Sequence, residues 1–214
     1  MTTTPAPLRV TSLQSPDHTA YLALLALTTS GDGLPPAAGW TLTLPPGRQP
    51  FTHGPALCLT ARTRSGTKPH GALFAASPNW TSEHPLTRNN PELAARLDHT
   101  ILCIYGLAVA PRHRDRGIAR TLVTEAETRA RNAGYRLSTL IHKPELAPFY
   151  KRLGYTTAHH TAIGLPPPHH LIGLTHPPYM TAVKALHPDV HVHIHPQPDD
   201  SVSTVTGLLP HPTT

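Results

Sequence analysis

One glycine among cations marks the part of the sequence whose chemistry is easiest to interpret. In residues 110–123, APRHRDRGIARTLV, an apolar run ends at Pro111, three arginines and a histidine follow, and Gly117 stands where an amphipathic helix is expected to begin. Glycine costs about 1 kcal/mol against alanine inside a helix, and the helix dipole repels cations at its N-terminus. Backbone N–H groups there lack intrahelical acceptors, however, and a residue without a side chain lets a phosphate approach them closely. The stretch therefore predicts a site for an anion.

The side chains around this glycine both favour and oppose an anion. Arg114 and Arg116 can add charge-assisted contacts, and Ala119 keeps the first helical turn thin. Asp115 opposes them, because a carboxylate beside a phosphate is tolerated only if it turns to solvent or pairs with Arg112. The simpler alternative is a solvated basic turn that caps a helix and binds nothing.

The elements that must position this turn follow an α/β order. Residues 100–109, TILCIYGLAV, form a nearly continuous apolar run with the length of a central strand. Residues 116–132 carry apolar side chains at helical spacing and end before Gly134. Further strands are predicted at 8–13, 56–63, 71–77, 135–142, 155–163 and 179–186, helices at 15–29, 92–97 and 146–153, and an edge strand or loop at 40–44. This order predicts an α/β fold with a single mixed central sheet flanked by helices.

The composition changes only near the C-terminus. We expect one domain over residues 1–186 and a Pro/His-rich C-terminal extension over 187–214, with an added edge strand at 191–195 and a disordered end. The sequence HVHIH places three histidines on one strand face, which could offer imidazoles to zinc or nickel. The chain contains 17 histidines in all, so this spacing is weak evidence and no metal site is expected.

Charge and cysteine content narrow the class of protein. The formal net charge is +6, but the 18 lysines and arginines are dispersed except around 112–120 and lack interleaved aromatics, which argues against nucleic acid. The apolar run at 21–27 is too short to cross a membrane. Cys58 and Cys103 lie within apolar runs, and the N-terminus lacks a secretory pattern. We therefore expect a cytoplasmic protein with reduced core thiols and no membrane partner.

Two segments together resemble a known family. Arg114, Gly117 and Ala119 reproduce an RxxGxG/A pattern between a strand and a helix, which is similar to the pyrophosphate loop of the GCN5-related N-acetyltransferase (GNAT) family. Downstream, PFYKRLGY at 148–155 resembles the FYxxLGF segment of that family. The resemblance covers about 100–185 firmly and 8–77 more loosely. It implies the acyl-CoA N-acyltransferase fold, with acetyl-CoA as acyl donor and coenzyme A as product.

The resemblance also implies roles for particular residues. Tyr150 would be the general acid that protonates the leaving thiolate, to which a phenol with a pKa of about 10 is suited. A purely structural alternative is that Phe149, Tyr150 and Tyr155 pack a short helix on the sheet. Coenzyme A would contact the pyrophosphate loop and the end of the central strand, at Leu107, Ala108, Val109, Arg114, Arg116, Gly117, Ile118, Ala119 and Arg120.

The general base is not fixed by the resemblance. Relatives often carry a glutamate four residues before the position of Val109, where this chain has Tyr105. Asp98, His99 and His142 lie near strand ends and could each relay a proton through water. A covalent route through Cys103 lacks a histidine tied to it by a motif, so a core thiol is the simpler interpretation.

These residues predict an enzyme, an N-acetyltransferase that moves acetyl to a primary amine of a small molecule by direct attack in a ternary complex. An antibiotic or a metabolite is the expected kind of acceptor, but the sequence does not identify it. A monomer and a homodimer are equally compatible with the sequence. The alternative is a non-catalytic acyl-CoA-binding sensor or interaction protein on the same fold, which the missing glutamate favours.

Overall fold

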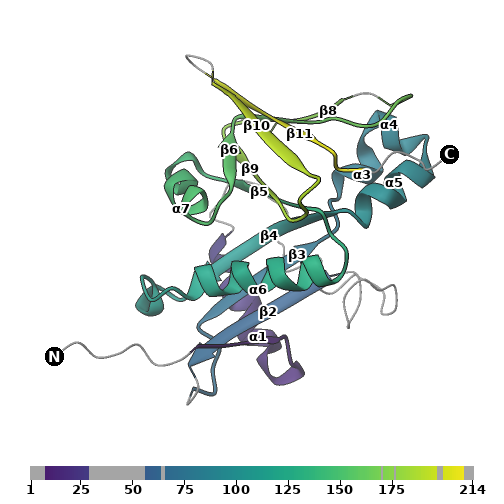
Figure 1. The fold of residues 1–214 in the computed structure, drawn as a ribbon. Helices are drawn as coiled ribbons and strands as arrows, with labels where there is room; N and C mark the ends of the chain where they lie inside the picture. The colour runs from purple at the N-terminus through teal and green to yellow at the C-terminus, as the bar shows by residue number, and fades with distance from the viewer. Residues whose placement is uncertain are drawn as a thin grey trace. The chain divides into compact units, whose positions relative to one another are not determined.

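The computed structural model describes residues 8–28, 56–63, 66–169, 171–175, 177–196 and 200–209. The fold is of the α/β class, with a large mixed sheet flanked by helices, as predicted (Figure 1). The described residues form two compact units, one from the residues up to Ala76 with Ile104–Arg129, the other from Ser77–Cys103 with the residues from Ala130 onward. The edge strand or loop predicted at 40–44 lies outside the described residues.

The first unit is built on an antiparallel meander. Strands β1 (Leu8–Ser12), β2 (Ala56–Thr63) and β3 (Gly71–Ala76) pair in that order, and the part of β4 (Ile101–Val109) from Ile104 lies beside β3. The hairpin predicted from 56–63 and 71–77 is confirmed, with Cys58 opposite Phe74 in the register. Every residue of β3 is buried, because the strand has neighbours on both sides and helices on its faces.

A short helical segment covers one face of this sheet. The helix predicted at 15–29 begins as a 3₁₀ turn, η1 (Ser15–Asp17), continues as α1 (His18–Leu25) and ends as η2 (Ala26–Thr28). Tyr21 is fully buried, and its hydroxyl donates to the Leu73 carbonyl at 3.0 Å. An ion pair between Asp17 and Arg62 ties η1 to β2.

Helix α6 (Ile118–Asn132) begins directly after the anion-binding turn predicted from the sequence. The stripe predicted from the helical spacing, Ile118, Leu122, Ala126 and Ala130, is buried. Val123 and Glu127 are buried as well. A Cβ added at Gly71 would lie 2.6 Å from Ile118 Cγ2 and 3.0 Å from Leu122 Cδ1, so β3 admits the first turn of α6 only because residue 71 has no side chain.

The second unit contains the start of β4, followed in its sheet by β5 (Leu137–His142), β9 (Met180–Ala185) and β6 (Thr156–Ala158). Its helices are α3 (Trp80–Glu83), α4 (Pro85–Arg88), α5 (Pro91–Asp98) and α7 (Ala147–Arg152), and the 3₁₀ turn η4 (Pro144–Leu146) leads into α7. Asn90 caps the N-terminus of α5, since its Oδ1 accepts the Leu93 N–H at 3.0 Å. The sequence analysis missed α3 and α4, because four residues show no helical periodicity.

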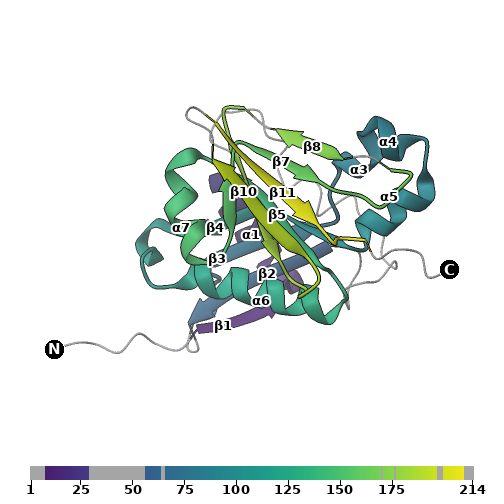
Figure 2. The same cartoon turned by 45° about the horizontal axis from the view of Figure 1, so that its top comes forward.

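A separate four-stranded sheet completes this unit (Figure 2). Its order is β10 (His191–Pro196), β11 (Ser201–Thr206), β7 (His160–Ile163) and β8 (Ile172–Thr175). The prediction of a single strand at 155–163 is therefore wrong, because the strand breaks at His159. On one side of the break β6 pairs with β9, and on the other side β7 pairs with β11 and β8. The strand predicted at 191–195 is present as β10, but Ser201–Thr206 form a strand where disorder was predicted.

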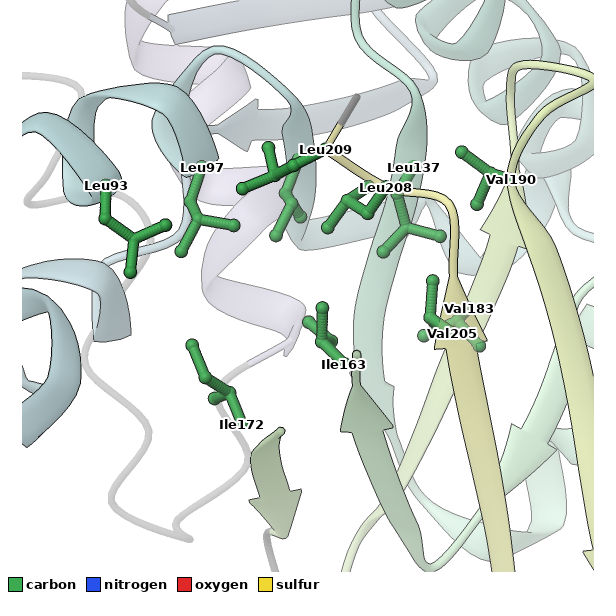
Figure 3. Packing of buried hydrophobic residues seen from close by; sticks show 11 residues of the cluster. Leu93, Leu97, Leu137, Ile163, Ile172, Val183, Val190, Val205, Leu208 and Leu209 are labelled. Carbon is green, nitrogen blue, oxygen red and sulfur yellow. The ribbon is translucent and has the colours of Figure 1, made fainter. Parts of the chain in front are cut away.

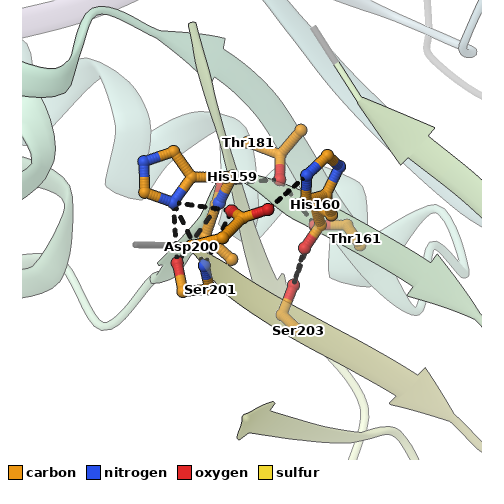
Figure 4. Close-up of polar contacts among 8 residues, drawn as sticks. His159, His160, Thr161, Thr181, Asp200, Ser201 and Ser203 are labelled. Atoms are coloured by element: carbon orange, nitrogen blue, oxygen red, sulfur yellow. Dashed lines mark hydrogen bonds and ion pairs between the residues drawn. The ribbon is translucent and has the colours of Figure 1, made fainter. Parts of the chain in front are cut away.

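A polar network explains why β11 is ordered (Figure 4). The Asp200 carboxylate lies 3.1 Å from His159 Nδ1 and 2.7 Å from His160 Nε2. Below it, the buried Thr161 hydroxyl lies 2.6 Å from that of Thr181 and 2.8 Å from that of Ser203. These contacts link β11 to β7 and β9, which a reading of local composition could not anticipate.

The apolar core of the second unit is built largely from leucine, isoleucine and valine (Figure 3). Leu137 is fully buried in it. We expect Leu137→Ala to lower the free energy of unfolding by about 2–5 kcal/mol, because the cavity adds to the lost transfer energy. Urea denaturation measures this. Leu171, which is 56% exposed, provides the control, and an equal loss in Leu171→Ala would contradict the assignment of the core.

None of the described helices has the length and apolar composition needed to cross a bilayer.

Candidate functional site

The turn between β4 and α6 has an unusual backbone. After the 3₁₀ turn η3 (Pro111–His113), Asp115 has φ 60° and Gly117 has φ 77°. Asp115 is the only non-glycine residue with positive φ in the described part of the chain, and aspartate is among the few residues that tolerate this conformation. Turns that contain left-handed residues are one of the backbone arrangements with which proteins bind anions.

The space beside Gly117 is open. A Cβ added at Gly117 would meet no atom within 4 Å, and Gly117 is exposed. Ile118 is buried, at 2% exposure, and anchors the start of α6 in the core. The side chains of Arg114, Arg116 and Arg120 are exposed, and Ala119 is half-buried. The predicted pyrophosphate residues are thus brought together at one helix N-terminus.

A pair of stacked histidines supports the turn, and the sequence analysis did not single it out. The rings of His70 and His113 lie 3.7 Å apart with an interplanar angle of 13°. The Ala110 N–H donates to the His70 carbonyl at 2.8 Å, which ties the loop to the residue before β3. Burial lowers the pKa of His70, and the nearby His113, Arg116 and Arg62 lower it further. No sequence signal could reveal the pair, because its members are far apart in the chain.

The end of β4 supplies the predicted pantetheine-binding backbone. Ala108 is buried, whereas Leu107 and Val109 are half-buried. Tyr105, which stands where relatives often carry a glutamate, packs its ring 5.8 Å from that of Phe74. In the first unit Tyr105 therefore belongs to an apolar cluster.

Tyr150 lies in an aromatic cluster of the second unit. It sits on α7, which ends at Gly154 with φ 85°, and is 7% exposed. Its ring centroid lies 5.0 Å from that of Phe149, 5.9 Å from that of Tyr155 and 5.0 Å from that of His142. Burial raises the pKa of Tyr150 to about 12. The phenol is therefore protonated across the physiological range, as a proton donor must be.

The candidate bases differ in their surroundings. The Asp98 carboxylate accepts a hydrogen bond from the Thr81 hydroxyl, and burial raises the pKa of Asp98. His99 caps the end of α5 through its backbone N–H. Among the three, only His142, at the end of β5, makes a ring contact with Tyr150 in the described residues.

The thiols and the histidine-rich strand do not form a reactive centre. Cys103 is buried, and burial also raises the pKa of Cys58, which is hydrogen-bonded to Tyr21. His191 and His193 on β10 have ring centroids 6.4 Å apart. Within the described residues, no group of three or more His, Cys, Asp or Glu side chains is placed to hold a metal ion.

Solved structures share this fold. A GNAT family N-acetyltransferase (YhbS) from Escherichia coli in complex with CoA superposes with a TM-score of 0.55 at 19% identity, over 88% of this chain and 87% of that chain. Arabidopsis thaliana NAA60 in complex with acetyl-CoA superposes with a TM-score of 0.54 at 16% identity, over 84% of this chain and 98% of that chain. The ribosomal-protein-S18-alanine N-acetyltransferase from Escherichia coli superposes with a TM-score of 0.51 at 12% identity, over 84% of this chain and 94% of that chain. No curated protein matched the sequence.

These similarities define the class: an α/β protein with the fold of the acyl-CoA N-acyltransferases. Within this fold, residues 88–157 match the model of the acetyltransferase (GNAT) domain. This match confirms the resemblance to the GNAT family that the sequence predicted. The matched segment includes the turn before α6 and Tyr150.

Proposed function

We propose that the chain is an acyl-CoA-dependent N-acyltransferase that moves acetyl from acetyl-CoA to the primary amine of a small molecule. The observation that carries this proposal is the turn with Asp115 and Gly117 in left-handed conformation, directly before α6 and within the segment that matches the GNAT domain. The PFYKRLGY form of the second segment, at 148–155, supports a small-molecule acceptor.

The donor is held mainly by the backbone in this proposal. The N–H groups from Arg114 to Arg120 bind the pyrophosphate of coenzyme A, with Arg114 and Arg116 adding charge. The peptide groups of Leu107, Ala108 and Val109 pair with the pantetheine arm as an added strand would. Backbone binding fits the exposed, side-chain-free approach at Gly117.

The reaction is a direct transfer. The amine nitrogen attacks the thioester carbonyl carbon, a C–N bond forms, the C–S bond breaks, and the nitrogen loses one proton. The leaving thiolate takes the proton of the Tyr150 hydroxyl. A phenol with a pKa of about 12 donates to a thiolate as the negative charge develops, and water exclusion around its buried ring keeps that proton available.

We further propose that residues 1–186 form the catalytic domain and 187–214 an extension to it, and that the protein acts in the cytoplasm. Cys58 and Cys103 are not joined to each other in a disulfide and lie within apolar stretches, as is typical of a reducing compartment.

The proposed function is tested by incubating the protein with acetyl-CoA and a panel of amines. The release of free thiol measures the turnover. The proposal requires a rate that depends on the amine. Tight coenzyme A binding without turnover on any amine would instead support an acyl-CoA sensor, a role favoured by Tyr105 lying in an apolar cluster where relatives often carry a glutamate.

Asp115 offers a prediction about donor affinity. The carboxylate of this exposed residue repels the pyrophosphate, so we expect Asp115→Asn to bind coenzyme A about twofold to fivefold more tightly. Asparagine also tolerates φ 60°, so the backbone stays unstrained. Calorimetric titration at low and high salt measures the change, which should shrink with salt. Weaker binding by the variant would mean that Asp115 does not face the pyrophosphate.

A further inference from the structure

A buried nitrogen without a partner lies beside Tyr150. His142 is 4% exposed, and its Nε2 atom has no hydrogen-bond partner among the described residues. Its ring centroid lies 5.0 Å from that of Tyr150, with the planes tilted by 37°. Buried side-chain nitrogens are nearly always paired, and an orphaned one commonly marks a catalytic role or a site that a ligand completes.

The tautomer of this ring follows from its other nitrogen. His142 Nδ1 lies 2.8 Å from the Lys143 carbonyl oxygen. A carbonyl oxygen only accepts, so Nδ1 carries the hydrogen and donates it. A neutral ring then has its lone pair on Nε2, the atom that lacks a partner.

Burial keeps the His142 ring neutral at rest. Burial lowers the pKa of His142 below the ordinary imidazole value, and the Lys143 carbonyl and the Glu145 carboxylate oppose this to a smaller extent. The titratable groups that face it are Tyr150 from α7 and Glu145 from η4, whereas β9 places the uncharged Met180 opposite it in the register. The ring is thus neutral at neutral pH, with Nδ1 protonated and Nε2 unprotonated, and Glu145 favours the cation when Nε2 accepts a proton.

We infer that His142 is the general base of the transfer, with Nε2 accepting the proton that the amine nitrogen loses, directly or through one water. This step rests on the proposed function. The protons then balance between His142 and Tyr150. His142 Nε2 gains the amine proton, the Tyr150 hydroxyl gives its proton to the thiolate, and the imidazolium of His142 returns a proton to the tyrosinate. The last transfer is favourable because a phenolate whose acid has a pKa of about 12 is a stronger base than imidazole.

The rival groups lack this combination of features. The Asp98 carboxylate accepts a hydrogen bond from the Thr81 hydroxyl, and the backbone carbonyl of Asp98 accepts one from Ser77 Oγ at 2.8 Å. Within the described residues, neither Asp98 nor His99 makes a ring contact with Tyr150.

Two substitutions separate proton transfer from hydrogen bonding. In His142→Asn the amide nitrogen occupies the place of Nδ1 and keeps the bond to the Lys143 carbonyl, but nothing replaces Nε2. In His142→Gln an amide reaches the place of Nε2 without being basic. We expect kcat to fall about 100-fold or more in both variants, with coenzyme A affinity unchanged. The wild type should lose activity as pH falls through the pKa of His142, and both variants should lack that acidic limb.

Controls keep the inference apart from the proposed function. His99→Asn should retain wild-type kcat, and thermal unfolding should show that all variants fold. The same acceptor is used throughout, so titration of the amine itself affects every profile equally. If the wild type shows no amine-dependent turnover, the proposed function fails and this step with it. If the wild type turns over and His142→Gln keeps its kcat and its acidic limb, only the assignment of the base is overturned.

Discussion

Tyr150→Phe is expected to lower kcat by about 10²–10⁴-fold, because the thiolate then leaves without a proton donor. Phenylalanine retains the ring contacts with Phe149, Tyr155 and His142, so the cluster and the fold should persist. Coenzyme A affinity should be unaffected, since the proposed pyrophosphate site is the turn before α6. Single-turnover kinetics with a saturating amine, together with calorimetric binding of coenzyme A, measures both quantities.

Tyr155→Phe is the matched control for Tyr150→Phe. It removes a hydroxyl from the same aromatic cluster, but that hydroxyl is paired with Ser138 Oγ at 2.8 Å. The loss of this buried bond should reduce the free energy of unfolding by about 1 kcal/mol and leave kcat near that of the wild type. Equal kcat in Tyr150→Phe and wild type would exclude Tyr150 as the acid, and equal losses in both variants would indicate packing alone.

Gly117→Ala is expected to weaken coenzyme A binding by about 10- to 100-fold, the value of one or two lost charge-assisted hydrogen bonds. The added methyl would occupy the open space through which the pyrophosphate approaches the amides. Alanine at φ 77° also strains the backbone, which costs about 1–2 kcal/mol of stability. Affinity and stability must therefore be measured separately, by calorimetry and by urea denaturation.

Gly134 provides the control that separates these two effects. It lies just beyond the other end of α6, is exposed, has φ 90°, and has nothing within 4 Å of an added Cβ. Gly134→Ala should therefore lose about as much stability as Gly117→Ala, through the same left-handed strain, and bind coenzyme A normally. Equal affinities in the two variants would show that Gly117 does not adjoin the bound cofactor.

Local sequence patterns predicted the elements that carry the proposed cofactor site. The apolar run predicted as a strand at 100–109 contains β4, the helical spacing at 116–132 contains α6, and Gly117 lies exposed directly before that helix. Each of these signals is contained in fewer than about twenty neighbouring residues, because strand length, helical period and glycine conformation are local properties.

The features that were missed depend on distant partners. The break at His159 and the order in β11 follow from Asp200, which contacts both His159 and His160 far away in the sequence. The stack of His70 on His113 likewise joins separate segments. The sequence left Asp98, His99 and His142 as equal candidates for the base, and among the described residues the tertiary structure distinguishes His142 by its buried, unpaired Nε2. Burial and pairing are properties of the folded chain.

The most direct test of the account is a residue-resolved NMR titration of the backbone amides with coenzyme A. Binding through the turn before α6 predicts that the largest shifts fall on the amides from Arg114 to Arg120, with smaller shifts along Leu107, Ala108 and Val109. Titration with inorganic pyrophosphate should reproduce the first set and not the second. Saturating shifts that lie elsewhere in the chain, with these amides unchanged, would contradict the account.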